Sequence, residues 1–286
     1  MNLKLNRLAK IIIFGFSFFL FNSEESQARN LPTCQIDPAD STKMKDFECY
    51  STPTIYEITI YEMGLCVSDP LNGTTYNAGS GYAESDFVID ESSCEITFKS
   101  DNGIVADLAQ GQINLVGQDF RPPSKQYNHA YLKFKNSQGI TAKFEIDDTS
   151  FCSKNEESDT NALQGSPDCT AQKFNTNLID FRAGSSCSTP SSNYLGATYS
   201  SFDAGIVKAL LTDISYNPQS SCNSTATKRI YGSFEPVNPI NIDNTTKGLQ
   251  VSFSVTNKGL LINTDNNRNL ITSFAGGPLT PTFEKF

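Results

Sequence analysis

The sequence offers a single imidazole for acid–base or nucleophilic chemistry, that of His129. A Ser-His-Asp triad would therefore have to use His129, and a site that needs two histidines, such as H-E-x-x-H, is excluded. The one suggestive serine lies in Gly79-Ser80-Gly81, but Ala78 stands where the G-x-S-x-G nucleophile elbow requires its first glycine. These residues therefore indicate no serine hydrolase.

Two pairs of adjacent carboxylates, Asp90-Glu91 and Asp147-Asp148, lie at the ends of expected strands, where acidic side chains can project into a cleft. The two acids of a glycoside hydrolase can come from distant strands, so such a pair is compatible with glycan chemistry. Solvated acidic turns have the same composition. The sequence favours a non-catalytic protein and leaves a carboxylate-based glycan-active enzyme open as an alternative.

Three ring-bearing residues, Tyr127, His129 and Tyr131, alternate along one expected strand, on the face opposite Ala130 and Leu132. Carbohydrate-binding proteins use flat aromatic platforms, and tyrosine can replace the tryptophan that this chain lacks. Tyrosine is also common in strands for its β-propensity alone. We predict these three residues as the ligand-binding candidates, on a solvent-facing strand.

The segment Asn263-Thr-Asp265-Asn-Asn267 places oxygen ligands at every second position, as the start of an EF-hand loop does. Arg268 stands where the turn glycine belongs, and Phe274 stands where the bidentate glutamate belongs. A thiolate metal site needs spacing close to C-x-x-C, which the chain lacks. We therefore predict no metal-ligating residues and no cofactor, and structural calcium stays open.

The eight cysteines are even in number and all follow the first 28 residues. In an exported protein this count indicates up to four disulfides. Because short loops close most readily, we predict pairing between nearest neighbours, with each bridge stabilising the fold by about 3 kcal/mol. The predicted pairs are Cys34–Cys49, Cys66–Cys94, Cys152–Cys169 and Cys187–Cys222.

Residues 1–28 have the composition of a signal peptide. Lys4, Arg7 and Lys10 precede the apolar run 11–21, and Ser26-Gln27-Ala28 supplies small residues for cleavage. An eleven-residue helix rises only about 17 Å, which is too short for the hydrocarbon core, although an uncleaved anchor remains an alternative. We expect a bacterial protein that is secreted, periplasmic or on the cell surface, with no membrane span after cleavage.

The charge and composition limit the partners. The formal net charge is −9 with no basic cluster, which disfavours nucleic acids and anionic membrane surfaces. With 38% hydrophobic residues, including 20 Phe and 11 Tyr, the chain can bury a core. The partner itself is unknown from the sequence, and self-association or a surface glycan are the open candidates.

The longest β-favouring run is 54–66. Tyr56, Ile58 and Ile60 share one parity, and the apolar parity then moves to Tyr61, Met63 and Leu65. Such a change requires an extra residue, a β-bulge, or a strand buried on both sides. A strand that passes from one sheet of a sandwich to the other would also show this pattern.

Other segments predict short strands and turns. Hairpins are expected over 130–146, turning at 136–139, and over 251–262, turning at 257–259. Strands are also expected at 87–89, 94–99, 104–108, 113–116, 178–181, 228–234 and 271–274, with a turn at 100–103. The segment 37–45 could form a short helix capped by Asp37, and 206–214 fits either a helix or a strand.

These elements predict an all-β protein, an antiparallel β-sandwich or jelly-roll-like fold stapled by disulfides. The polar segment 151–170 divides the chain into an N-terminal β-domain over 29–150 and a C-terminal β-rich region over 151–286, unless both form one sandwich. We predict an exported, non-catalytic structural or adhesive surface protein. The alternative is a secreted glycan- or ligand-binding module, or the glycan-active enzyme above.

Overall fold

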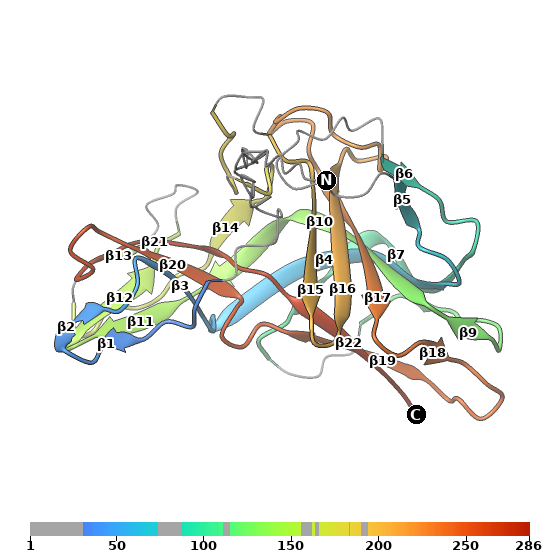
Figure 1. Ribbon diagram of the computed structural model, residues 1–286, viewed down its shortest axis with the longest axis horizontal. Coiled ribbons are helices and arrows are strands. Elements are labelled where there is room, and N and C mark those ends of the chain that lie inside the picture. Colours follow the sequence, from blue (N-terminus) through green and yellow to red (C-terminus); the bar gives the residue numbers. More distant parts are fainter. Residues whose placement is uncertain are drawn as a thin grey trace, which may run out of the picture.

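The computed structural model describes residues 31–73, 87–110, 115–155, 162–163, 166–182, 184–189 and 194–286. These residues form antiparallel β-sheets stapled by disulfides, which confirms the predicted fold class. Figure 1 shows an elongated arrangement, with the strands β1, β2 and β11–β13 at one end and β5, β6, β9 and β18 at the other. None of the described residues belongs to a helix that could span a membrane.

One large sheet runs through the centre of the molecule (Figure 1). Among the described residues it contains eight strands in the order β15-β16-β17-β10-β4-β7-β8, with β14 paired to part of β10. Its strands are β4 (Ile55–Cys66), β7 (Cys94–Asp107), β8 (Gln118–Asp119), β10 (His129–Thr141), β14 (Phe174–Asn177), β15 (Ala197–Phe202), β16 (Gly205–Thr212) and β17 (Arg229–Pro236). Strands from both sides of residue 150 therefore share this sheet.

Smaller sheets surround the large one. β3 (Glu48–Ser51), β20 (Leu260–Thr264) and β21 (Ile271–Gly276) form one, and β19 (Leu249–Ser254) pairs with β22 (Thr280–Lys285). The others are β1 (Ile36–Asp37) with β2 (Asp40–Met44), β5 (Leu71–Gly73) with β6 (Phe87–Ile89), β9 (Gln126–Tyr127) with β18 (Ile240–Asn241), and β11 (Lys143–Ile146) with β12 (Thr149–Ser153) and β13 (Ala162–Leu163).

The central strand β4 contains the predicted irregularity. Lys133 and Phe134 are adjacent on β10, yet their partners on β4 are Glu62 and Ile60, so Tyr61 is an extra residue. Because of this bulge, the odd-numbered Met63 and Leu65 follow the even-numbered Ile60 on the same side of the sheet. The bulge is confirmed at the predicted position. The idea that the strand moves to a second sheet is wrong, because β4 stays between β10 and β7 throughout.

The bulge gives the large sheet two different sides. On one, which we call the cavity face, the register places Ile60, Met63 and Leu65 beside Ala130, Leu132 and Phe134 of β10 and Ile230 and Phe234 of β17. On the other, the ion-pair face, it places Glu62 beside Lys133, and Tyr131 beside Ser233. The largest buried cluster spans the cavity face and the small sheets, and includes Tyr56, Ile58, Phe134, Ile140 and Phe274.

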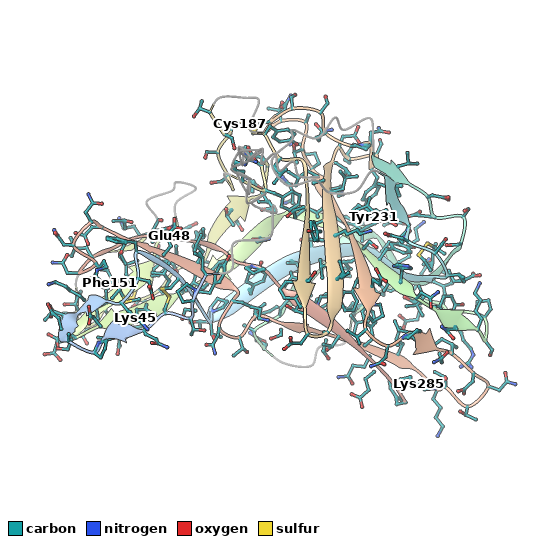
Figure 2. All side chains as sticks on the ribbon, in the orientation of Figure 1. Lys45, Glu48, Phe151, Cys187, Tyr231 and Lys285 are labelled. Atoms are coloured by element: carbon teal, nitrogen blue, oxygen red, sulfur yellow. A yellow bond between two sulfur atoms is a disulfide. The ribbon has the colours of Figure 1, made fainter. Side chains whose placement is uncertain are left out.

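All eight cysteines are paired, and the four pairs are the predicted ones: Cys34–Cys49, Cys66–Cys94, Cys152–Cys169 and Cys187–Cys222. Figure 2 shows Cys187 at the top of the molecule, far from Phe151 and Lys45 at the left end and Lys285 at the lower right. Cys66 and Cys94 face each other across β4 and β7. The disulfides thus cross-link the chain at four separate places.

The expected helix over 37–45 is wrong, and of the two alternatives left open for 206–214 the structure has the strand. Over 37–45 the chain forms the β1–β2 hairpin, and the Asp37 carboxylate accepts the amide N–H of Ala39 at 2.9 Å in a turn instead of capping a helix. The segment 206–214 instead falls within and just after β16, between β15 and β17. Leu210 and Leu211 are both buried although they point to opposite sides, because both sides of the sheet are covered there. A strand buried on both sides loses the alternation that distinguishes it from a helix.

The predicted hairpin over 130–146 is also wrong, because β10 continues through 136–139. Asn136 is buried inside the strand, and its side-chain amide donates to the carbonyl oxygens of Leu178 and Thr227 at 3.2 and 3.1 Å. Tertiary contacts thus satisfy polar residues that resemble a turn in sequence. The chain bends only after Thr141, where β11 leaves to pair with β12.

The second predicted hairpin has correct strands but the wrong partners. The chain turns at 255–259, where Gly259 N–H donates to the Val255 carbonyl at 2.8 Å and Asn257 has a φ of 55°. The strands on either side then separate, since β19 pairs with β22 and β20 pairs with β21 and β3. β22 also follows β21, so 271–274 is not the last strand.

The remaining predicted elements are confirmed or corrected as follows. Strands over 87–89, 94–99, 104–108 and 228–234 correspond to β6, the two halves of β7, and β17. The predicted turn over 100–103 is an irregularity inside β7, where Gly103 has a φ of 75°. The strand predicted at 113–116 is not seen: residues 113 and 114 lie outside the described residues, and 115–116 are not in a strand. The strand predicted at 178–181 is also wrong, since this segment forms only an isolated β-bridge at Asp180.

Candidate functional site

The three predicted ligand-binding residues do not share an exposed face. Tyr127 is 0% and Tyr131 4% exposed, so the expectation of a solvent-facing aromatic platform is wrong. The Tyr127 hydroxyl donates to the Pro123 carbonyl at 2.9 Å, and the Tyr131 hydroxyl donates to Glu62 at 2.9 Å. His129 is partly buried, and desolvation lowers the pKa of its imidazole against the opposing field of Asp69. A binding role for these residues stays a prediction.

Tyr131 instead belongs to a buried polar cluster on the ion-pair face. The Lys133 ammonium lies 2.7 Å from Glu62 and 2.8 Å from Glu91. The Tyr131 ring stacks on Tyr231, with centroids 5.7 Å apart. Burial opposes the charge on Lys133, but its bonds to Glu62 and Glu91 outweigh this and raise the pKa of its ammonium. Burial, followed by the nearby Glu62, raises the pKa of the Tyr131 phenol.

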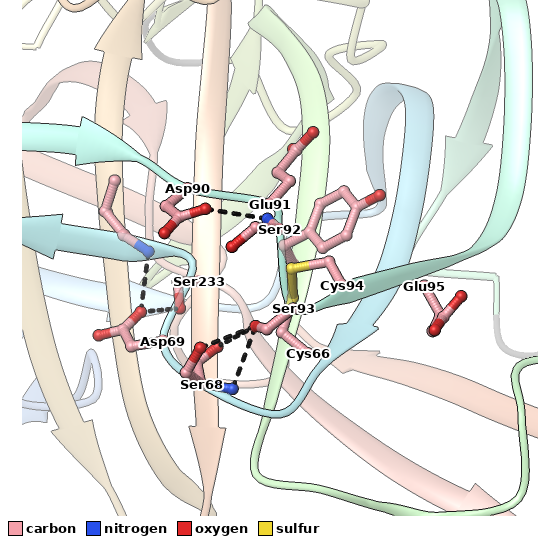
Figure 3. Close-up of a disulfide and its surroundings, with 12 residues drawn as sticks. Cys66, Ser68, Asp69, Asp90, Glu91, Ser92, Ser93, Cys94, Glu95 and Ser233 are labelled. Atoms are coloured by element: carbon pink, nitrogen blue, oxygen red, sulfur yellow. Dashed lines mark hydrogen bonds between the residues drawn. A yellow bond between two sulfur atoms is a disulfide. The ribbon is translucent and has the colours of Figure 1, made fainter.

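Described residues at both ends of the segment between Cys66 and Cys94 lie at or near this cluster. Figure 3 shows Glu91 above the Cys66–Cys94 disulfide and Asp69, bonded to Ser233, to its left. The Ser233 hydroxyl donates to Asp69 at 2.9 Å, and Lys208 forms an ion pair with the same carboxylate. Each carboxylate here, Glu62, Glu91 and Asp69, has a cationic partner. The arrangement therefore anchors the segment to the sheet.

The predicted carboxylate pairs do not meet in a cleft. Asp90 accepts the amide N–H of Ser92 at 2.9 Å, and Glu91 is held by Lys133. Asp147 and Asp148 lie in the turn between β11 and β12, where Asp147 has a φ of 52°. Among the described residues no group of three or more His, Cys, Asp or Glu side chains is placed to hold a metal ion. The pairs thus have the geometry of structural turns.

The opposite side of the sheet is hollow. A cavity of about 520 Å³ lies between the cavity face and the strands β19, β22, β20 and β21. Its walls are mainly apolar: Met63, Leu65, Leu132, Phe134, Val207, Ala209, Ile230 and Phe234 come from the large sheet, and Val251, Phe253, Leu279 and Phe283 face them. This volume is within the range of small-molecule sites, which are largely apolar and have few polar groups.

Polar side chains gather where the cavity meets β3, β14 and β20. They are Glu48, Tyr50, Gln138, Thr176, Arg182 and Asn263. The register explains part of this set: Glu48 and Tyr50 on β3 pair with Asn263 and Leu261 on β20, so all four point to the same side of that small sheet. The Asn263 amide donates to Ser273 at 2.9 Å on the neighbouring strand. The cavity is therefore most polar at this end and mainly apolar along the rest, where Thr97 and Thr198 are among its polar residues.

A second hollow lies across β19. It measures about 880 Å³ and shares Met63, Leu249, Val251 and Phe253 with the first cavity. Its other walls include Phe98, Phe120, Arg121 and Phe286. Arg121 donates to the carbonyl oxygen of Asp243 at 2.9 Å and to that of Thr246. β19 thus separates two spaces beneath the same sheet.

The sequence does not reveal the cavity, because its walls come from strands that are distant in the chain. Leu65, Leu132 and Phe234 meet only through the order β17-β10-β4. The one local signal was the parity change after Ile60, which shows that Met63 and Leu65 continue the apolar side. Nothing in the hydrophobic periodicity of the sequence indicates that β19 and β22 cross over this side of the sheet.

Comparisons with known proteins give no relative: no family model, curated protein or solved structure matches the chain significantly.

Proposed function

We propose that the protein is an exported, non-catalytic binding protein whose ligand is a small amphiphile held in the 520 Å³ cavity. The observation that carries this proposal is the division of the cavity into a long apolar part and one polar end. Apolar walls favour a hydrocarbon portion through the hydrophobic effect, and the polar end favours a head group that keeps its hydrogen bonds. Four disulfides support an oxidising environment outside the cytosol.

The structure offers a position from which the cavity can be filled. A Cβ added to Gly232 meets no atom closer than 3.7 Å, and Gly232 lies between Ile230 and Phe234 on β17. Its register partner Leu132 faces the cavity, so a valine side chain at 232 would project into the same space. Gly232→Val should therefore reduce the space for a ligand without straining the backbone.

The test is titration of the purified protein with a fluorescent fatty-acyl probe. We expect saturable binding with one site, and at least about tenfold weaker binding for Gly232→Val, since filling the site removes contacts worth more than 1.4 kcal/mol. Ser201→Val adds similar bulk to an exposed position of β15 and serves as the matched control. No saturable binding, or equal binding by Gly232→Val, would contradict the proposal.

A structural or adhesive role at the surface is the second candidate. Among the described residues β19 and β22 pair only with each other, so their outer edges are unpaired. Unpaired edges can join chains through main-chain hydrogen bonds. Sedimentation over a wide concentration range distinguishes this role: assembly with increasing concentration supports it, and a strict monomer counts against it.

A further inference from the structure

Gln138 is one of the buried polar residues of the large sheet. Its side chain is 8% exposed and borders the polar end of the cavity. Its amide makes no hydrogen bond within the described part of the chain, whereas the buried Asn136 two residues earlier makes two. The amide atoms of Gln138 are not among the fully enclosed polar atoms without a partner, so the amide is accessible to a group that enters the cavity.

The surroundings hold this amide at the cavity. Gln138 lies opposite Ile58 on β4 and Thr176 on β14, in the middle of the sheet. Gly276 of β21 faces it, and a side chain at that position would overlap the amide. The absence of a side chain at Gly276 therefore leaves room for the amide.

The charges at this end cancel. The lining includes the carboxylate of Glu48, which also has an interaction with another group, and the guanidinium of the exposed Arg182. An anionic head group would be attracted by the Arg182 guanidinium but repelled by the Glu48 carboxylate, and a cationic one the reverse, so neither charge has a net advantage. A hydroxyl group both donates and accepts, as the Gln138 amide does, so it can use the amide, the guanidinium and the carboxylate together.

We infer that the ligand is a single-chain amphiphile with an uncharged, hydroxyl-rich head group, and that the Gln138 amide is the residue that recognises this head. This inference rests on the proposed function, since the tail occupies the apolar part of the same cavity. Two sources supply such a head group, glycerol in a monoacylglycerol and a sugar in an alkyl glycoside. The glycerol and sugar heads share the same chemistry and differ in size.

The test uses competition against the bound fluorescent acyl probe. Four competitors share a sixteen-carbon chain: 1-monopalmitoylglycerol, hexadecyl glucoside, palmitate and hexadecyltrimethylammonium, each below its micellar concentration. We expect at least one hydroxyl-rich competitor to bind about tenfold more tightly than the two charged ones, because their charges meet a like charge in the site. The stronger of the two hydroxyl-rich competitors identifies the glycerol or sugar source.

Two variants assign the recognition to Gln138. Gln138→Leu should weaken binding of the preferred hydroxyl-rich competitor about 5- to 10-fold, the loss of one or two neutral hydrogen bonds, and leave the charged competitors within about twofold. Gln126→Leu makes the same change at an exposed position of β9, outside the cavity, and should leave all affinities unchanged. Thermal unfolding of both variants checks that the fold is retained.

The outcomes separate this inference from the proposed function. If the acyl probe does not bind, the proposed function fails. If the probe binds but a charged competitor equals or exceeds both hydroxyl-rich ones, the head-group assignment fails. If Gln138→Leu weakens all four competitors equally, or none, Gln138 does not recognise the head group.

Discussion

The two sides of the large sheet differ in how they hold charged and neutral polar groups. On the ion-pair face Lys133 forms ion pairs with both Glu62 and Glu91, and Glu91 belongs to the segment that Cys66–Cys94 closes. On the cavity face Gln138 is just as buried and has no partner within the described residues. A polar cluster whose charges are paired stabilises one structure, whereas a buried amide that borders a cavity is placed to bind another molecule. The comparison separates residues that hold the fold from residues available for function.

The largest effect is expected from breaking the ion-pair face. In Lys133→Met the Glu62 carboxylate, which is 8% exposed, loses its cationic partner. We expect a loss of about 3 to 5 kcal/mol in the free energy of unfolding, measured by denaturant titration, because an uncompensated buried charge remains. Lys173→Met, which breaks the exposed pair with Glu57, should cost less than about 1 kcal/mol. Equal losses in the two variants would show that the cluster is not effectively buried.

Removing the disulfide beside this cluster should have the next largest effect. The double variant Cys66→Ser and Cys94→Ser opens a loop that spans 28 residues. Chain entropy predicts a loss of about 3.5 kcal/mol in the free energy of unfolding. Because the disulfide lies on the ion-pair face, the affinity for the acyl probe should stay within about twofold. A large loss of binding by a folded double variant would mean that the two faces are coupled.

The same small substitution on each face gives a direct comparison. Gly64→Ala would place a Cβ 2.6 Å from the Glu95 carbonyl oxygen and inside the space of the Tyr131 ring, and overpacking of this kind costs about 1 to 3 kcal/mol. In Gly232→Ala the new Cβ would lie 3.7 Å or more from its nearest neighbours on the cavity face, which is ordinary van der Waals contact. This change should alter the free energy of unfolding by less than about 1 kcal/mol. Similar values for the two, from denaturant titrations, would contradict the difference in packing.

The smallest effect concerns acid stability on the ion-pair face. Burial opposes ionisation of Asp69, but hydrogen bonds from Lys208, the Leu71 amide and Ser233 lower the pKa of its carboxyl below 3.8 overall. A lowered pKa contributes stability above 3.8 that disappears as pH falls through the folded value. Asp69→Asn should therefore lose stability at neutral pH and show a shallower decline below pH 4. Parallel acid profiles for the two proteins, from thermal unfolding, would contradict this assignment.

The sequence predicted local features better than the pairing of strands into sheets. The four disulfides, the bulge after Ile60 and most strand positions follow from residues close together in the chain. The turns at 136–139 and the helix at 37–45 were wrong, because buried contacts of Asn136 and a turn at Asp37 overrode local preference. Neither the crossing of β19–β22 over the sheet nor the cavity beneath it could be predicted, since both depend on pairings between distant segments. For the same reason Gln138 was taken as part of a turn.

The local pairing of the cysteines bears on how the chain acquires its structure. The paired residues are 15, 28, 17 and 35 positions apart, and no disulfide loop overlaps another. A chain that emerges from a pore with its N-terminus first can therefore close each bond before the next pair of cysteines appears. Sequential oxidation of this kind gives the native connectivity without exchange between pairs, so a simple thiol oxidant would suffice and a disulfide isomerase would not be needed. Assembly of the large sheet, which needs β16 and β17 from late in the chain, would then follow on segments already closed.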